Sequence, residues 1–250
     1  MVKRAGLALG FTLIEMGIVL VVIGLILSGG IVALTPIVQN TKISETNGIM
    51  DRVEQALVLH VIRYGCLPCP AAPGSASTDA NAGRAVAGGA AYSTGCQAAA
   101  CDNAQGIVPW VNLDLSENNV SDGFGTRLSY AITPNLHVAN SMVRTPPATY
   151  PAGTLVVNNT TPVQITAAAA YTLISHGPNR VWGYRSQTGG QLAVDPNASV
   201  PELANSNGTP FVQDEVTLLL GATYFDDIVR WRSAPFIIQL CGSNACGNPA

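Results

Sequence analysis

The chain has 250 residues, of which 48% are hydrophobic and 11% are charged, and its formal net charge is −3. This length provides one globular domain with a sizeable core in addition to an N-terminal segment. The negative net charge gives no electrostatic footprint for nucleic acid, so we expect no nucleic-acid partner. The hydrophobic fraction argues against disorder, although the charged fraction is low beside the usual value of about a quarter.

The first element is a basic leader followed by a long apolar run. Lys3 and Arg4 are the only charges before Glu15, and no charge follows Glu15 until Lys42. An uncharged run of this length predicts a helix that spans a bilayer of about 30 Å. Because positive charges favour the cytoplasmic side, we expect a single membrane span with a cytoplasmic N-terminus.

Gly10 and Glu15 distinguish this segment from other apolar N-terminal segments. A secretory signal peptide has its small-residue cleavage site after the apolar region, whereas Gly10 precedes it. A plain membrane anchor leaves Glu15 unexplained, because a carboxylate in such a helix costs about 2.5 to 3.5 kcal/mol on insertion scales. An anchor whose glutamate reaches the membrane interface is the alternative interpretation.

The string GFTLIE, residues 10–15, resembles the processing site of type IV prepilins and of the pseudopilins of type II secretion. The resemblance implies that a prepilin peptidase cleaves after Gly10 and methylates the new amino group of Phe11. It also implies that Glu15 of one subunit pairs with the Phe11 amine of its neighbour in a filament. The same resemblance implies a single-pass inner-membrane protein with a periplasmic head, which later becomes part of a periplasmic or extracellular filament. An unpaired carboxylate in an apolar filament core would be strongly unfavourable.

The helix is expected to continue beyond the apolar run. After Lys42 the apolar residues recur with a period near 3.6, which predicts an amphipathic helix that ends at Gly65. Gly24, residues 29–30 and Pro36 weaken the first half locally. These residues suggest a segment of the long helix that can bend or melt when the helix is extracted from the membrane.

Three parts follow from this pattern: a leader at 1–10, a long helix at 11–65 whose first half is transmembrane, and a periplasmic globular head at 66–250. The predicted fold class is α+β and pilin-like, with the long N-terminal helix packed on an antiparallel β-sheet head domain. Residues 71–100 are rich in Ala, Gly and Ser and are expected to form loops. Strand candidates in the head lie at 128–132, 154–157, 171–175, 181–185, 228–231 and 236–240.

Short strings in the head also resemble pseudopilin-like proteins. The DDIVRW string at 226–231 is similar to the head of the major pseudopilin, and this favours the type II secretion branch. The five strings that resemble pseudopilin-like proteins are, in chain order, GCLPCPA, GIVPW, DGFGTRLSYAI, LISHGPN and FDDIVRW.

The chain has six cysteines, in the sequence pairs Cys66/Cys69, Cys96/Cys101 and Cys241/Cys246. All follow the long helix, which predicts disulfide bonds formed in an oxidising periplasm. We expect a local bridge within the third pair, and bridges that join the first pair to the second with the exact connectivity left open. A zinc site made by the first four cysteines is the alternative, although their spacing lacks a second CxxC motif.

A calcium site is a further hypothesis. The major pseudopilins that this head resembles bind calcium in a loop between their last strands, and Asp226 and Asp227 occupy a similar place. Residues 175–180, SHGPNR, are less acidic than the family loop, which leaves few ligands. In the alternative interpretation, Asp226 caps a turn and Asp227 pairs with Arg230 or Arg232.

No catalytic residues are predicted. Ser175 and His176 could belong to a hydrolytic triad, but no GxSxG motif surrounds Ser175, so we expect a protein that is not an enzyme. The expected function is that of a structural subunit of a type II secretion pseudopilus. The expected partners are homologous filament subunits, prepilin peptidase and an inner-membrane assembly platform. The alternatives are a type IV pilin for adhesion, motility or DNA uptake, and a membrane-anchored periplasmic enzyme.

Overall fold

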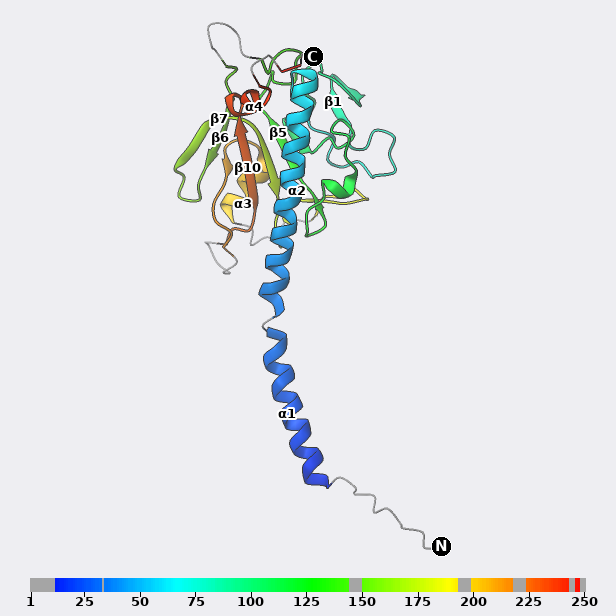
Figure 1. Cartoon of the computed structure of the whole chain (residues 1–250), viewed down its shortest axis with the longest axis vertical. Helices are drawn as coiled ribbons and strands as arrows, with labels where there is room; N and C mark the ends of the chain where they lie inside the picture. The colour runs from blue at the N-terminus through cyan, green and yellow to red at the C-terminus, as the bar shows by residue number, and fades with distance from the viewer. Residues whose placement is uncertain are drawn as a thin grey trace. The chain divides into compact units, whose positions relative to one another are not determined.

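The structure is a computed structural model, and it describes residues 12–32, 34–143, 150–192, 199–217, 224–242 and 246–247. The side chains of residues 26–32, 34–36 and 207 are outside this description. The chain forms two compact units, Met1–Thr41 and Lys42–Ala250. Figure 1 labels the elements along the chain.

The N-terminal residues form two helices, α1 (Leu13–Val32) and α2 (Leu34–Tyr64), and the prediction of one continuous helix over 11–65 is wrong. Pro36 lies in the first turn of α2, where its missing N–H needs no helical partner. A proline in a helix interior would instead remove a hydrogen bond, so the chain begins a new helix before Pro36.

Within the residues that the structure describes, no helix is both long and apolar enough to cross a membrane. The predicted transmembrane first half is therefore wrong, and so is the predicted single-pass inner-membrane placement. The apolar run is divided between two helices, because α1 ends at Val32 and α2 begins at Leu34.

The second unit is built around a six-stranded sheet in the order β3-β5-β7-β6-β9, with β10 also paired to β7. The pair β6–β9 is parallel and the other pairs are antiparallel, so the sheet is mixed and the prediction of a purely antiparallel sheet is wrong. A parallel neighbour requires a crossover connection, and α3 (Val200–Asn207) lies in the chain between β6 and β9. The strands are β3 (Gln105–Ile107), β5 (Ser129–Ile132), β6 (Leu155–Asn158), β7 (Gln164–Ser175), β9 (Phe211–Val212) and β10 (Ile228–Ser233).

Two short pairs of strands accompany the main sheet. The first pair, β1 (Ala85–Ala87) and β2 (Ala90–Tyr92), is a hairpin in a region expected to be loop. Its turn residues Gly88 and Gly89 both have positive φ, which suits a tight hairpin turn. The second pair is β4 (Thr126–Arg127) with β8 (Tyr184–Arg185), and a short 3-10 helix, η1, spans Glu117–Asn119.

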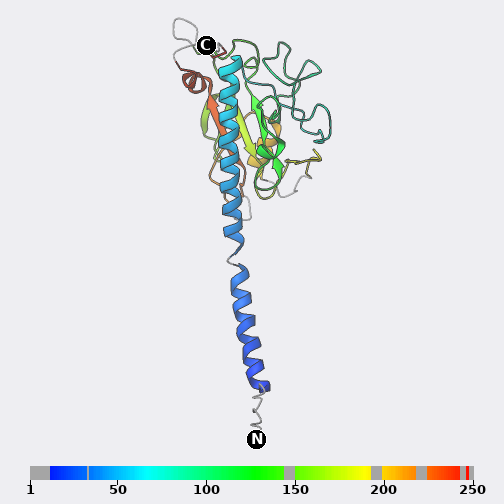
Figure 2. The same cartoon turned by 45° about the vertical axis from the view of Figure 1, so that its right-hand side comes forward.

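The core of the second unit lies between α2 and the sheet. Met50, Val53, Leu57 and Val61 recur on one side of α2 and are fully buried. They belong to one apolar cluster that also contains residues of β5 and β7, and α2 runs beside β5 in Figures 1 and 2. Burial of each such side chain contributes about 1.5 to 3 kcal/mol, so α2 is an integral part of this unit.

A fourth helix, α4 (Ala234–Leu240), replaces the strand expected at 236–240. Ser233 is its N-cap residue and a proline follows in the first turn, which is a typical helix start. The apolar side chains of Ile237 and Ile238 are buried in the core cluster.

Candidate functional site

The residues predicted for processing, Gly10 and Phe11, lie outside the described residues. Glu15 lies in the first turn of α1 and is exposed. Its carboxylate accepts hydrogen bonds from Thr12 N at 2.8 Å and from Thr12 Oγ1 at 2.9 Å, and Glu15 N donates to Thr12 Oγ1 at 3.3 Å. This reciprocal pattern is a capping box, and its hydrogen bonds lower the pKa of Glu15. Glu15 therefore has partners within its own helix.

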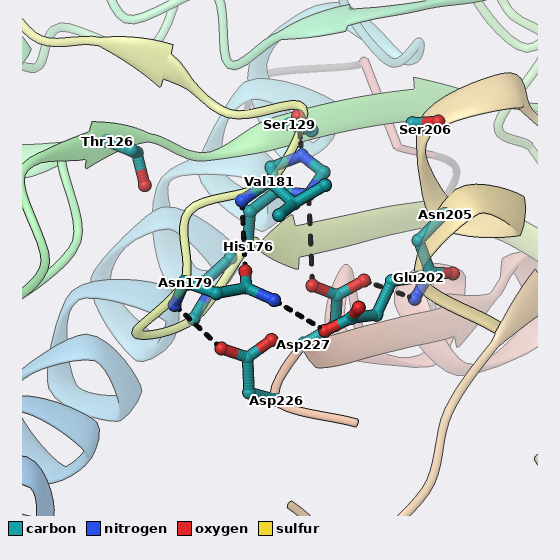
Figure 3. Close-up of polar contacts among 12 residues, drawn as sticks. Thr126, Ser129, His176, Asn179, Val181, Glu202, Asn205, Ser206, Asp226 and Asp227 are labelled. Carbon is teal, nitrogen blue, oxygen red and sulfur yellow. Dashed lines mark hydrogen bonds and ion pairs between the residues drawn. The ribbon is translucent and has the colours of Figure 1, made fainter. Parts of the chain in front are cut away.

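The head contains a buried cluster of three carboxylates, which we call the acidic cluster: Glu202, Asp226 and Asp227 (Figure 3). One oxygen from each lies within 4.8 Å of the others, and all three residues are at most 2% exposed. Burial raises the pKa of Asp226 to about 8 and raises the pKa of Asp227 well above its ordinary value. The structure therefore brings together the two predicted residues and adds a third carboxylate.

Glu202 owes its position to the start of α3. Ser199 is the N-cap residue, and its N–H donates to Glu202 Oε2 at 2.9 Å while Glu202 N donates to Ser199 Oγ at 3.5 Å. The other carboxylate oxygen, Oε1, accepts a hydrogen bond from Asn179 Nδ2 at 2.8 Å. Sequence reasoning missed Glu202, although the string Ser-Val-Pro-Glu carries the signature of a capping box.

The two aspartates differ in how their oxygens are satisfied. Asp226 Oδ2 accepts hydrogen bonds from Asn179 N and from Tyr224 Oη, both at 2.8 Å. Asp226 Oδ1 is buried and accepts no hydrogen bond from an N–H or hydroxyl group among the described residues. After burial, a hydrogen bond between the Asp226 and Glu202 carboxyl groups is the next cause that raises the pKa of Asp226. Asp227 Oδ2 accepts from Asn205 Nδ2 at 2.8 Å. An oxygen without a donor among like charges is a position that a cation could fill.

The predicted alternative for Asp227 does not describe its surroundings, because both arginines bind other acids. Arg232 pairs with Glu54 at 2.8 Å, and Arg230 pairs with Asp51 and, at 3.6 Å, with Glu54. These ion pairs join β10 to α2, and no arginine of the described residues forms an ion pair with the acidic cluster.

His176 connects the acidic cluster to the sheet, as Figure 3 shows. Its Nε2 lies 2.9 Å from Ser129 Oγ, and its Nδ1 lies 3.8 Å from Asp227 Oδ1. The second distance is too long for a hydrogen bond, and all three residues are at most 2% exposed. Burial lowers the pKa of His176 to about 4. Ser129, His176 and Asp227 follow one another in the order of a catalytic triad. The Ser129 hydroxyl is buried, however, so a substrate has no access to it.

Ser175 belongs to a different buried network. Its hydroxyl donates to Asp122 Oδ2 at 2.6 Å, and the same carboxylate accepts hydrogen bonds from Thr126. Asp122 thereby connects β7 to the turn before β4. Ser175 and His176, considered above as members of one hydrolytic triad, therefore belong to two different networks: Ser175 bonds to Asp122, and His176 contacts Ser129 and Asp227.

The six cysteines form three disulfide bonds, Cys66–Cys96, Cys69–Cys101 and Cys241–Cys246. Two of them join the segment after α2 to the loop at 96–101, with 30 and 32 residues of sequence separation. The third closes a local turn of five residues' separation, and Gly247 N beyond it donates to Ile62 O of α2 at 2.9 Å. The disulfides therefore fasten chain segments around the end of α2.

The donor set of the acidic cluster suits a hard cation. Carboxylate oxygens are the preferred ligands of Ca²⁺, and three converge here with one oxygen lacking a donor. The 175–180 loop supplies Asn179 and His176 instead of further carboxylates.

Comparisons of the chain with protein-family models, with curated proteins and with solved structures find no match in any of the three.

Proposed function

We propose that this chain is a structural subunit of a filament of the type IV pilin and pseudopilin class, cleaved after Gly10. The observation that supports the proposal most directly is the exposed apolar surface of α1. Leu13, Ile14, Leu20 and Val21 are 94%, 73%, 66% and 63% exposed. A contiguous apolar surface of this kind marks an interaction site.

The distribution of these side chains favours several partners over one. Every side chain described in α1 is exposed, so the helix has no single apolar stripe. A helix that is apolar all round is stable when it is surrounded, and parallel copies of the same helix in a filament would surround it. Burial of each large apolar side chain would contribute about 1.5 to 3 kcal/mol to such an assembly.

Glu15 is the one charged residue in this surface. Its capping box with Thr12 already provides donors to the carboxylate, which reduces the cost of removing it from water. The amine of Phe11 from a neighbouring subunit would neutralise the remaining charge.

The first experiment tests processing. The full chain is expressed with a prepilin peptidase, and its mass and N-terminal residue are measured. We expect loss of residues 1–10 and addition of one methyl group to Phe11. The variant Gly10→Val should remain uncut, whereas the matched control Gly6→Val should be cleaved normally. An uncut wild-type chain in the presence of an active peptidase would overturn the proposal.

The second experiment tests assembly of the processed chain. Sheared filaments are collected by sedimentation and the subunit is quantified. Glu15→Ala should reduce incorporation by at least about tenfold, because it leaves the neighbour's amine buried and unpaired. Glu45→Ala, which removes an exposed acid of α2, is the matched control. Normal incorporation of Glu15→Ala would contradict the predicted pairing.

We also propose that the acidic cluster holds a calcium ion that stabilises the head. Asp226 Oδ1 supports this second proposal, because it is a buried acceptor without a donor among the described residues. A cation would displace the protons of these buried carboxyl groups and balance the charge of the carboxylates that result. It would also connect α3 to the segment before β10.

Calcium binding is tested by thermal unfolding of the full chain. An ion that binds only the folded state must raise the melting temperature, and the increase should grow with calcium concentration. Glu202→Gln and Asp226→Asn should abolish the increase, whereas Asp114→Asn, which alters an exposed acid paired with Arg63, should retain it. An unchanged melting temperature across the titration would contradict the proposal.

A further inference from the structure

A second group of metal-binding side chains lies apart from the acidic cluster, around the disulfide bond between Cys69 and Cys101. The two sulfur atoms and a ring nitrogen of His137 all lie within 4.8 Å of one another. His137 is 4% exposed, Cys69 is fully buried and Cys101 is half-buried. Two sulfurs and an imidazole are the ligands of many zinc sites, but here the sulfurs are joined to each other.

The hydrogen bonding of His137 leaves one ring nitrogen free. Its Nδ1 is buried and has no hydrogen-bond partner among the described residues. The backbone of Ala99 also acts on the ring through a hydrogen bond. In a neutral imidazole one ring nitrogen carries a lone pair that can bind a metal.

The backbone holds these residues in place independently of the disulfide bond. Gln97 N donates to His137 O at 3.0 Å, and the side chain of Gln97 accepts from Cys69 N at 3.0 Å. On the other side, Asp102 N donates to Val86 O at 3.1 Å, next to Cys101. The two thiols would therefore remain near the imidazole after the S–S bond is broken.

We propose that Cys69, Cys101 and His137 form a redox-gated site for a thiophilic divalent metal such as Zn²⁺. In the oxidised chain the disulfide occupies both sulfurs. A dithiol reductant transfers two electrons and two protons to the S–S bond, which gives two thiols while the reductant becomes a disulfide. The metal ion then displaces both thiol protons and binds two thiolates and a ring nitrogen of His137, with water as the fourth ligand.

The experiment uses Co²⁺ as the spectroscopic probe. The full chain is reduced with a dithiol, freed of reductant without oxygen, and titrated with Co²⁺. We expect one Co²⁺ per chain, with thiolate-to-cobalt charge-transfer absorption and the visible bands of tetrahedral Co²⁺, both removed by added Zn²⁺. The oxidised chain should show neither signal. Absence of the thiolate signal after reduction would overturn the proposal.

Two kinds of variant test which ligands bind the metal. His137→Asn should weaken binding by at least about tenfold. The matched control is His60→Asn, which alters the buried histidine that bonds to Cys66 O, and it should bind as the wild type does. A variant that retains only the proposed cysteine pair should also bind one Co²⁺; it carries serine at Cys66, Cys96, Cys241 and Cys246.

Two controls separate metal binding by the folded chain from metal binding by thiols of an unfolded, reduced chain. Circular dichroism is recorded on each sample, and the titration is repeated in guanidinium chloride. If the reduced wild type and His137→Asn bind Co²⁺ equally, the thiols act without the imidazole and the proposed site does not exist.

Discussion

Gly177 lies where the backbone beside the acidic cluster has no room for a side chain. Its φ is +56°, and a Cβ atom placed on it would lie 2.2 Å from Asp226 O. The close approach allows the 175–180 loop to present Asn179 N to the Asp226 carboxylate. A single glycine therefore determines how closely two loops approach each other.

We predict that Gly177→Ala destabilises the head by at least about 1 to 3 kcal/mol, because the substitution adds both backbone strain and a backbone clash. Gly74→Ala is the matched control, since no atom lies within 4 Å of a Cβ at that position. Urea unfolding measures both variants. Equal stability of the two variants would show that the loop can move away from Asp226.

His60 predicts a dependence of stability on pH. Burial lowers its pKa from 6.5 to about 4, and its Nδ1 lies 3.1 Å from Cys66 O. Between these values the unfolded chain binds a proton that the folded chain does not, so stability is present above pH 6.5 and is lost as the pH falls toward 4. The full loss is on the order of 3 kcal/mol.

The variant His60→Asn keeps a donor for Cys66 O and removes the titrating group. Its free energy of unfolding, measured in urea from pH 4 to pH 7, should therefore fall less steeply with acid than that of the wild type. His176, whose pKa burial lowers to about 4, should preserve part of the slope. Identical slopes for variant and wild type would show that His60 does not titrate in this range.

At the scale of elements, the sequence predicted strands where apolar runs are bounded by turn residues, and β5, β6, β7 and β10 overlap the predicted ranges. It misread 236–240, because a run of five residues is too short to show whether its period is that of a strand or a helix. Local residues mark this segment as a helix, because Ser233 is the N-cap residue of α4 and Pro235 lies in its first turn.

The candidate site, like the secondary structure, was predicted only in part from the sequence. Asp226 and Asp227 were identified because they occupy a place similar to that of the calcium-binding loop in the major pseudopilins, which this head resembles. Glu202 was missed because it is 24 residues from Asp226 in the sequence and only the packing of α3 brings it close. The predicted membrane helix was wrong because apolar composition alone does not show where helices begin and end around Pro36.

The disulfide bonds should stabilise the chain in proportion to the loops they close. In the chain-entropy treatment, a loop of the size closed by Cys66–Cys96, with 30 residues of separation, contributes about 3 to 4 kcal/mol. The loop closed by Cys241–Cys246, with a separation of 5, contributes about 2 kcal/mol. Paired serine variants of each bridge should follow this order in urea unfolding. A larger loss from the C-terminal bridge would show that packing outweighs loop entropy.

At the scale of the whole molecule, calcium and protons should compete for the acidic cluster. The folded pKa of Asp226 is raised from 3.8 to about 8, so the folded chain retains a proton that the unfolded chain loses. Without calcium, this carboxyl therefore makes stability fall as the pH rises from about 4 to 8, which is opposite to the effect of His60.

Calcium should consequently raise the melting temperature more at pH 8 than at pH 6, because fewer protons must be displaced at the higher pH. The measurement is thermal unfolding at both pH values with and without calcium. Asp226→Asn should show no calcium effect at either pH. A wild-type shift that is the same at both values would mean that binding does not displace the proton of Asp226.

The twelve residues of β7 pair with β5, β6 and β10, so three strands depend on one for their hydrogen bonds. Detachment of β5, β6 or β10 therefore requires that its hydrogen bonds to β7 break. The amide protons of Tyr171 to Ile174, which lie between two neighbouring strands, should therefore be among the slowest to exchange with deuterated water. Their exchange should report the opening of the entire head and not a local fluctuation.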